Sequence, residues 1–384
     1  MQDFRNDFRV RTAEGKCQKM NIKDRMIMDE YRTQKDDFIR LGETVHTMLR
    51  SMTKDAGIPV MSIEHRIKDE KSLEGKLYRK GDGYQSLDDL TDILGARIIC
   101  YFNDDVDKIG HLVEQAFVID WDKSSDKRAL MKADSFGYLS LHYICSVPQG
   151  GDCPEEMCHK RFEIQIRTML QHAWSDINHD LGYKSQFGVP RAVTREFARL
   201  AGLLEIADNE FVRVRDDMNR YTEETRRKII ENDADDVPID MVSLDEYMRS
   251  NGRMRNFIKR LASIENSEIS EINPEAYIPQ LKWLKIETIG DLAKMLERNE
   301  QLAYKLAEKV LRGSELDILA SNVALRFLCR AELVSGGYNA EQAAEFIVLS
   351  VNKKERAERQ AKRLFKMYAD IKQEGQGNPS GQIQ

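Results

Sequence analysis

Apolar and polar residues alternate with a period of two along the segment RFEIQIRT, which runs from Arg161 to Thr168. The apolar set is Phe162, Ile164 and Ile166, and the polar set is Glu163, Gln165 and Arg167. Because successive side chains of a β-strand point to opposite faces, this pattern predicts a strand with one buried face and one polar face. Such a strand either lies at a sheet edge with a solvated face or lines a polar cleft.

Two further segments predict strands with a polar face. They are ILGARIICYF, from Ile93 to Phe102, and YLSLHYICSV, from Tyr138 to Val147. Asp92 stands at the entrance of the first strand, and Arg97 points away from its apolar neighbours. In the second strand the polar face holds Tyr138, Ser140 and His142. Three such strands together predict the floor of a polar cleft.

Helical spacing of apolar residues predicts helices around these strands. The segments are 22–54, 104–117 and 169–181, and the second opens with acidic residues that suit the positive end of the helix dipole. Strands and helices that intermix in this way predict an α+β fold, with a mixed β-sheet flanked by helices. Beyond residue 190 only helical patterns remain, so we expect an all-α C-terminal region.

The changes of pattern divide the chain into five segments. We expect an N-terminal helical segment at 1–57, the sheet domain at 58–221, a charged linker at 222–242, a helical accessory domain at 243–371 and a disordered tail at 372–384. The long helix that closes the sheet domain should end near Tyr221. The helical domain suits homo-oligomer formation or a protein partner as well as a purely structural bundle.

The composition narrows the class of protein. The 384 residues are 41% hydrophobic and 32% charged, and their formal net charge of −6 argues against a nucleic-acid coat. No apolar run approaches the roughly 20 residues that a membrane span needs, so we expect no membrane association. Six scattered cysteines suit reduced thiols, and we expect a cytoplasmic protein.

Basic residues are frequent in the segment that precedes the strand predicted at Ile93 to Phe102. They surround Ser72 and are Arg66, Lys68, Lys71, Lys76, Arg79 and Lys80. A polyphosphate needs cations for its oxygens, and a magnesium ion (Mg²⁺) needs hard oxygen ligands such as Asp92 and Glu163. The chain has no Walker loop and no GxGxxG motif, so side chains rather than a glycine-rich turn would hold the phosphates.

Four segments carry a resemblance to a known family. RIKDEKS, DILGARI, GYLSLHY and EIQIRTMLQHAWSDINHDLGYK resemble the synthetase domain of the RelA/SpoT family, the (p)ppGpp or alarmone synthetases, over roughly residues 40–215. The combination of EIQIRT, HAW and YK is specific when it follows GYxSLH. The resemblance implies a nucleotidyltransferase-like mixed sheet. It also implies a GTP pyrophosphokinase, which transfers the pyrophosphate of ATP to the 3′-hydroxyl of GDP or GTP and releases AMP.

The same resemblance implies a role for each matching side chain. Arg66 and Arg97 would sandwich the adenine of ATP, an arrangement that suits planar guanidiniums. Lys68, Ser72 and Lys76 would contact the ATP phosphates. Asp92 and Glu163 would bind Mg²⁺, and Glu163 would also act as the base for the acceptor hydroxyl. The acceptor would be bound by Tyr138, which stacks on its base, and by His142, Gln165 and Arg167.

The segment before the second strand departs from the family pattern. It reads WDKSSDKRALMKADSFGY, and Phe136-Gly137-Tyr138-Leu139 stands where many members have Asn-Gly-Tyr-Gln. In the family the corresponding region helps to bind the acceptor, so the resemblance leaves two alternatives. One is a toxic pyrophosphotransferase that acts on the tRNA 3′ end or on adenine nucleotides. The other is a nucleotide-binding sensor without catalysis, against which the presence of both Asp92 and Glu163 argues.

Overall fold

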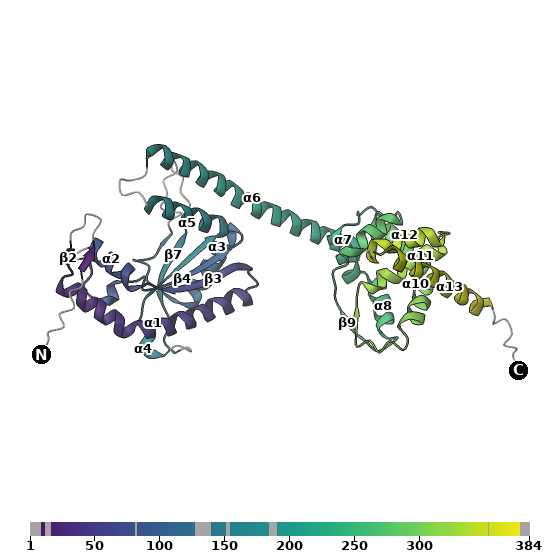
Figure 1. Ribbon diagram of the computed structural model, residues 1–384, viewed down its shortest axis with the longest axis horizontal. Helices are drawn as coiled ribbons and strands as arrows, with labels where there is room; N and C mark the ends of the chain where they lie inside the picture. Colours follow the sequence, from purple (N-terminus) through teal and green to yellow (C-terminus); the bar gives the residue numbers. More distant parts are fainter. Residues whose placement is uncertain are drawn as a thin grey trace. The chain divides into compact units, whose positions relative to one another are not determined.

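A computed structural model describes residues 9–11, 17–80, 83–126, 140–150, 154–183, 190–351 and 353–376. The chain divides into two compact units, Met1–Arg215 and Asp216–Gln384. The first unit contains the predicted sheet and the second is helical (Figure 1). Among the described residues, no helix is long and apolar enough to cross a membrane.

The first unit is built on a mixed sheet whose described part has six strands. The strand order is β3-β4-β8-β7-β5, with β6 beside β7. Their bounds are Val60–Ile67 (β3), Leu94–Cys100 (β4), Val118–Ile119 (β5), Ser125–Asp126 (β6), Leu141–Ser146 (β7) and Phe162–Thr168 (β8). Only the β4–β8 pair is parallel, and the other pairs are antiparallel. The predicted α+β class with a mixed sheet is therefore confirmed.

One face of this sheet is covered by two helices, α1 (Ile22–Asp55) and α3 (Asn103–Ala116). The apolar positions of β4 and β8 pack there with both helices, in a core that includes Leu41, Ile98, Ile109, Ile164 and Ile166. Both helices begin with residues that stabilise a helix N-terminus. The side chain of Asn21 caps α1 by accepting a hydrogen bond from the Asp24 backbone N–H, and Asp104 lies in the first turn of α3.

The remaining elements of the first unit surround this core. They are the hairpin strands β1 (Arg9–Arg11) and β2 (Cys17–Lys19), α2 (Glu70–Lys80), the 3₁₀ helix η2 (Leu87–Asp89), α4 (Glu155–Cys158), α5 (Met169–Tyr183) and α6 (Arg191–Ile230). The sequence did not predict the β1–β2 hairpin or β3. It placed the end of α6 near Tyr221, but the helix continues to Ile230 because Ile229 is buried in the core of the second unit.

The second unit is a helical bundle, as predicted. Its helices are α7 (Met241–Ser250), α8 (Gly252–Ala262), η3 (Glu275–Tyr277), α9 (Ile278–Trp283), α10 (Ile289–Leu311), α11 (Val323–Ser335), α12 (Ala340–Val351) and α13 (Lys354–Gln376). A short parallel pair, β9 (Glu268–Ser270) with β10 (Ile318–Ala320), was not predicted. Residues 372–376, which we expected to belong to a disordered tail, form the end of α13, where Glu374 accepts a hydrogen bond from Lys309 over 2.8 Å.

Candidate active site

The polar positions of four neighbouring strands lie on the sheet face opposite α1 and α3. In one row across the sheet, Glu64 of β3 pairs with Arg97 of β4, Arg97 with Gln165 of β8, and Gln165 with His142 of β7. In the adjacent row, Arg66 pairs with Gly95, and Gly95 with Glu163. Because paired residues point to the same face of a sheet, these side chains share one surface. The predicted polar cleft floor is therefore present.

A pocket of about 240 Å³ opens on this surface. The described residues that line it are Glu64, His65, Arg66, Lys68, Asp92, Gly95, Ala96, Arg97, Glu163 and Gln165. Two arginines, one lysine and three carboxylates thus face a single cavity. Gly95 lies between Arg66 and Glu163 and keeps open the space that a side chain would fill, since a Cβ at this position would meet no atom within 4 Å.

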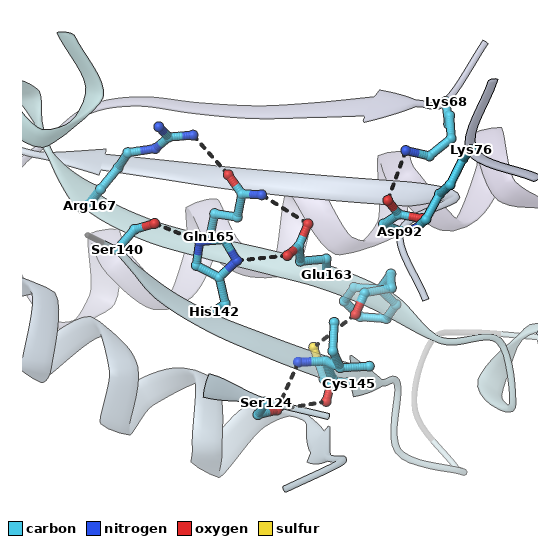
Figure 2. Close-up of polar contacts among 12 residues, drawn as sticks. Lys68, Lys76, Asp92, Ser124, Ser140, His142, Cys145, Glu163, Gln165 and Arg167 are labelled. Atoms are coloured by element: carbon cyan, nitrogen blue, oxygen red, sulfur yellow. Dashed lines mark hydrogen bonds and ion pairs between the residues drawn. The ribbon is translucent and has the colours of Figure 1, made fainter. Parts of the chain in front are cut away.

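Asp92 lies between two lysines at one end of the pocket (Figure 2). Its Oδ2 is 2.8 Å from Lys68 Nζ, and its Oδ1 is 2.7 Å from Lys76 Nζ. Burial pushes the pKa of Asp92 upward, but the hydrogen bonds and charges of the two lysines outweigh it and lower the pKa overall. The Lys68 backbone N–H donates to the Ile93 carbonyl over 2.8 Å, which holds Lys68 beside the entrance of β4. The site therefore keeps an ionised carboxylate next to two cations at neutral pH.

Glu163 lies at the centre of a chain of hydrogen bonds on β7 and β8 (Figure 2). His142 Nδ1 is 2.8 Å from Glu163 Oε1, and Gln165 Nε2 donates to Glu163 Oε2 over 2.9 Å. Burial raises the pKa of Glu163, but these two contacts outweigh it and lower the pKa overall. An ionised Glu163 only accepts, so Nδ1 of His142 carries the hydrogen. Nε2 of a neutral ring then accepts from Ser140 Oγ, 2.6 Å away.

Arg167 is the last member of this series of hydrogen-bonded side chains, after Gln165. Its Nη2 donates to Gln165 Oε1 over 2.8 Å, which fixes the orientation of the Gln165 amide. The Arg167 side chain is buried, and Asp176 Oδ1 of α5 lies 4.0 Å from its Nη1. Burial and the neighbouring charge of Arg97 lower the pKa of Arg167 to about 10, still well above neutral pH. Arg167 thus supports Gln165 from the next polar position along β8, and it is not among the described residues that line the pocket.

Comparison with known proteins identifies this part of the chain. Residues 65–187 match a family model described as the region found in RelA / SpoT proteins. The matched residues include the whole of β4, β7 and β8 and most of the pocket.

Residues 65–187 form a RelA/SpoT region.

Two named proteins and a solved structure are similar to part of this chain. GTP pyrophosphokinase YwaC of Bacillus subtilis (strain 168) is 27% identical over 164 residues, which are 42% of this chain and 76% of that protein. GTP pyrophosphokinase YjbM of the same organism is 26% identical over 178 residues, 46% of this chain and 81% of that protein. Among solved structures, the small alarmone synthetase 1 from Bacillus subtilis bound to its product pppGpp is 23% identical and has a TM-score of 0.42. The match covers 49% of this chain and 98% of that one.

Three residues that the resemblance assigned to substrates, Ser72, Lys76 and Tyr138, are not among the described residues that line the pocket. Ser72 is exposed and donates hydrogen bonds from its hydroxyl and its backbone N–H to the Asp69 carboxylate, over 2.7 and 2.9 Å, so Asp69 caps the start of α2. Lys76 is held by Asp92 and by the ring of Tyr84, 5.6 Å from its Nζ. Tyr138 lies outside the described residues. The roles that the resemblance assigns to these three and to the other site residues stay predictions.

The sequence analysis did not predict one charged residue that lines the pocket, Glu64. It belongs to the strand β3, where Ser62, Glu64 and Arg66 alternate along the polar face. That period-two signal is present in the sequence, but His65 occupies the intervening position and makes the run from 64 to 66 wholly polar. In the structure His65 points toward α1, where the centroid of its ring lies 5.5 Å from that of His46.

The pocket offers hard oxygen ligands to a metal ion. No group of three or more His, Cys, Asp or Glu side chains among the described residues is arranged to hold a metal. Asp92 and Glu163 line the same pocket, and the charge of Asp92 raises the pKa of Glu163. Mg²⁺ keeps several waters and typically binds one or two carboxylates together with substrate phosphates. The donor set therefore fits magnesium held jointly with a phosphate-bearing substrate.

Proposed function

We propose that this protein transfers the β,γ-pyrophosphate group of ATP to the 3′-hydroxyl of GDP or GTP and releases AMP. One observation carries the proposal: a single pocket in a RelA/SpoT region combines Arg66, Arg97 and Lys68 with the carboxylates Asp92 and Glu163. Cations suit polyphosphate oxygens, and carboxylates suit a metal and a base. The names of two relatives, both GTP pyrophosphokinases, support the same reaction.

ATP would occupy the β3–β4 side of the pocket. Arg66 and Arg97 are held on adjacent strands of one face, where two planar guanidiniums can flank an adenine ring. Lys68 and Lys76 already lie together around Asp92, so their ammonium groups are available to phosphate oxygens at that end. In this proposal the phosphates of ATP take over the lysines from Asp92, which frees the carboxylate oxygens.

The acceptor would enter on the β7–β8 side. Its 3′-hydroxyl donates a hydrogen bond to Glu163 and then transfers its proton to the carboxylate as the oxygen attacks the β-phosphorus of ATP. The bond between that phosphorus and the α,β-bridging oxygen breaks, and AMP leaves with the bridging oxygen. Because the pKa of Glu163 is lowered, the proton moves late, once bond formation to phosphorus has made the hydroxyl acidic.

The neighbours of Glu163 hold it ready for this step. His142 and Gln165 each donate to one of its oxygens, which fixes the plane of the carboxylate and keeps it ionised. Arg167 in turn fixes Gln165. Mg²⁺, held by Asp92 and Glu163 with the phosphates, would neutralise charge on the transferred group. Positioning and charge stabilisation would supply most of the rate.

The test is a transfer assay with the purified full chain, magnesium and ATP labelled at the γ-phosphate. GDP, GTP, ADP, ATP and bulk tRNA are offered as separate acceptors. We expect label on GDP and GTP, and transfer reduced by about 10²- to 10⁴-fold in a Glu163→Gln variant. Label on tRNA alone would replace the proposal by the tRNA-modifying alternative, and no transfer to any acceptor would refute it.

A further inference from the structure

The second unit contains a pocket of about 330 Å³ into which three arginines project. Arg326 and Arg330 come from α11, and Arg356 comes from the first turn of α13. The other described residues that line the pocket are Tyr277, Gln280, Phe346, Ile347, Ser350, Val351 and Gln360. This lining provides positive charge, amide and hydroxyl groups, and an apolar wall, but no carboxylate.

Other arginines of the second unit form ion pairs with carboxylates. Arg253 Nε lies 2.9 Å from Glu300 Oε2, and Arg260 Nη1 lies 2.6 Å from Glu300 Oε1. In contrast, no carboxylate among the residues that the structure describes forms an ion pair with Arg326, Arg330 or Arg356. Three guanidiniums therefore line one pocket to which the described residues contribute no carboxylate.

Arg330 bears most of the cost of this arrangement. Burial and the charge of the neighbouring Arg326 lower the pKa of Arg330 to about 10. Its hydrogen bond from Nη2 goes to a neutral partner, Oε1 of Gln360, over 3.2 Å. A buried charge that lacks a counterion is destabilising, and a close like charge adds to the penalty. An anion bound in the pocket would remove both costs.

We propose that this pocket binds a small molecule with two or more adjacent phosphate groups. Guanidiniums match phosphate oxygens in bidentate geometry, and three of them match more than one phosphate. The amide of Gln280, which is 4% exposed, provides a further polar group in the wall. The volume of about 330 Å³ lies at the lower end of the range for small-molecule sites and suits pyrophosphate or a nucleotide.

A nucleic acid or an acidic peptide fits the geometry less well. Either would need charges spread along a groove or a surface. Here the three arginines converge on one cavity, and along α13 the basic residues alternate with Glu355 and Glu358. The proposal concerns the second unit alone and does not depend on the reaction proposed for the first.

The test uses calorimetric titration of the full chain with inorganic pyrophosphate, without added magnesium. Wild type is compared with the double variant Arg326→Gln/Arg356→Gln, whose two positions are exposed and whose substitution should not impair folding. Arg359→Gln is the matched control, because Arg359 is exposed on the same helix and does not line the pocket. Any binding at the first unit is common to all three proteins.

We expect pyrophosphate to bind at least tenfold more weakly to the double variant, and within twofold of wild type to Arg359→Gln. We also expect pyrophosphate to raise the melting temperature of wild type and of the control more than that of the double variant, because stabilisation by a ligand grows with its affinity. Equal affinities in wild type and the double variant would overturn the proposal.

Further titrations separate the sources of the phosphate groups. ATP, GTP and pyrophosphate are each titrated into wild type and the double variant, and tighter binding of a nucleotide that the double variant loses identifies a nucleotide site. Binding of single-stranded oligonucleotide or poly-glutamate that is lost in the double variant, with no such loss for pyrophosphate or nucleotides, would overturn the small-molecule assignment.

Discussion

His142 on β7 and Glu163 on β8 meet diagonally across an antiparallel strand pair, with His142 Nδ1 2.8 Å from Glu163 Oε1. The contact helps to lower the pKa of Glu163 despite its burial, so this carboxylate stays ionised at neutral pH. It also fixes the direction in which Glu163 accepts hydrogen bonds. The sequence analysis named both residues as site candidates, but it did not predict that the two side chains contact each other.

Glu163→Gln should reduce pyrophosphate transfer by about 10²- to 10⁴-fold, the usual contribution of a general base. The substitution keeps the shape of the side chain but removes the charge that accepts the proton. Steady-state assays with ATP and GTP measure the loss. Glu64→Gln is the matched control: it makes the same change on the same sheet face of the same pocket, and we expect an effect of less than about tenfold, or ~1.4 kcal/mol. Equal losses in the two variants would contradict a special role for Glu163.

His142→Leu should move the acid limb of the pH–rate profile to higher pH. Glu163 is active when ionised, and its pKa rises when the hydrogen bond from His142 is lost, so protonation inactivates the variant at a higher pH than wild type. At neutral pH we expect kcat to fall roughly tenfold to a hundredfold, from the loss of about 1.5–3 kcal/mol for a hydrogen bond to a charged group.

The profile of His142→Asn serves as the comparison for His142→Leu. The asparagine amide can place an N–H near the position of Nδ1 and should restore much of the acid limb. An acid limb that is the same in wild type and both variants would show that His142 does not act through Glu163.

The sheet and its polar face were predictable because β4 and β8 obey a strict period of two. β3 was not, because His65 faces the helix side of the sheet and packs on α1: a Cβ on Gly42 would come within 2.7 Å of its ring. The contact is tertiary, and local pattern does not report it. The bonds of Ser72 to Asp69 are local, but they depend on where α2 begins, and the sequence analysis did not predict that helix. The RelA/SpoT resemblance, by contrast, was readable from motifs and is confirmed for residues 65–187.

Asp92→Asn should destabilise the first unit in a pH-dependent way. The lowered pKa of Asp92 means that its stabilisation is complete above the unfolded value of about 3.9 and is lost as the pH falls through the lower folded value. At pH 7 the variant leaves Lys68 and Lys76 facing each other, and we expect a loss of about 1 kcal/mol in the free energy of unfolding.

Urea denaturation at pH 7 and at pH 3 measures this difference for Asp92→Asn. The gap between wild type and variant should be smaller at pH 3. A gap that stays the same or grows at the lower pH would show that the two lysines do not hold Asp92 in its ionised form.

Gly290→Ala should destabilise the second unit, although alanine normally favours a helix over glycine. A Cβ at position 290 in α10 would lie 2.7 Å from Asp235 Cα and 2.8 Å from its carbonyl oxygen, so backbone would have to move. We expect a loss of about 1–3 kcal/mol, typical of overpacking. Gly252→Ala in α8 is the control, because a Cβ there meets nothing within 4 Å; it should be neutral or stabilising by up to ~1 kcal/mol. Thermal unfolding of both variants measures these changes in stability. A stabilised Gly290→Ala variant would contradict this packing.

The most direct test of the central claim is the identity of the adenine nucleotide released from ATP, measured by chromatography with and without GTP. Transfer of a pyrophosphate group predicts AMP, formed only when GTP is present and in equal amount to a guanosine product that carries pyrophosphate on its 3′-oxygen. Release of ADP, or of AMP at the same rate without an acceptor, would contradict it.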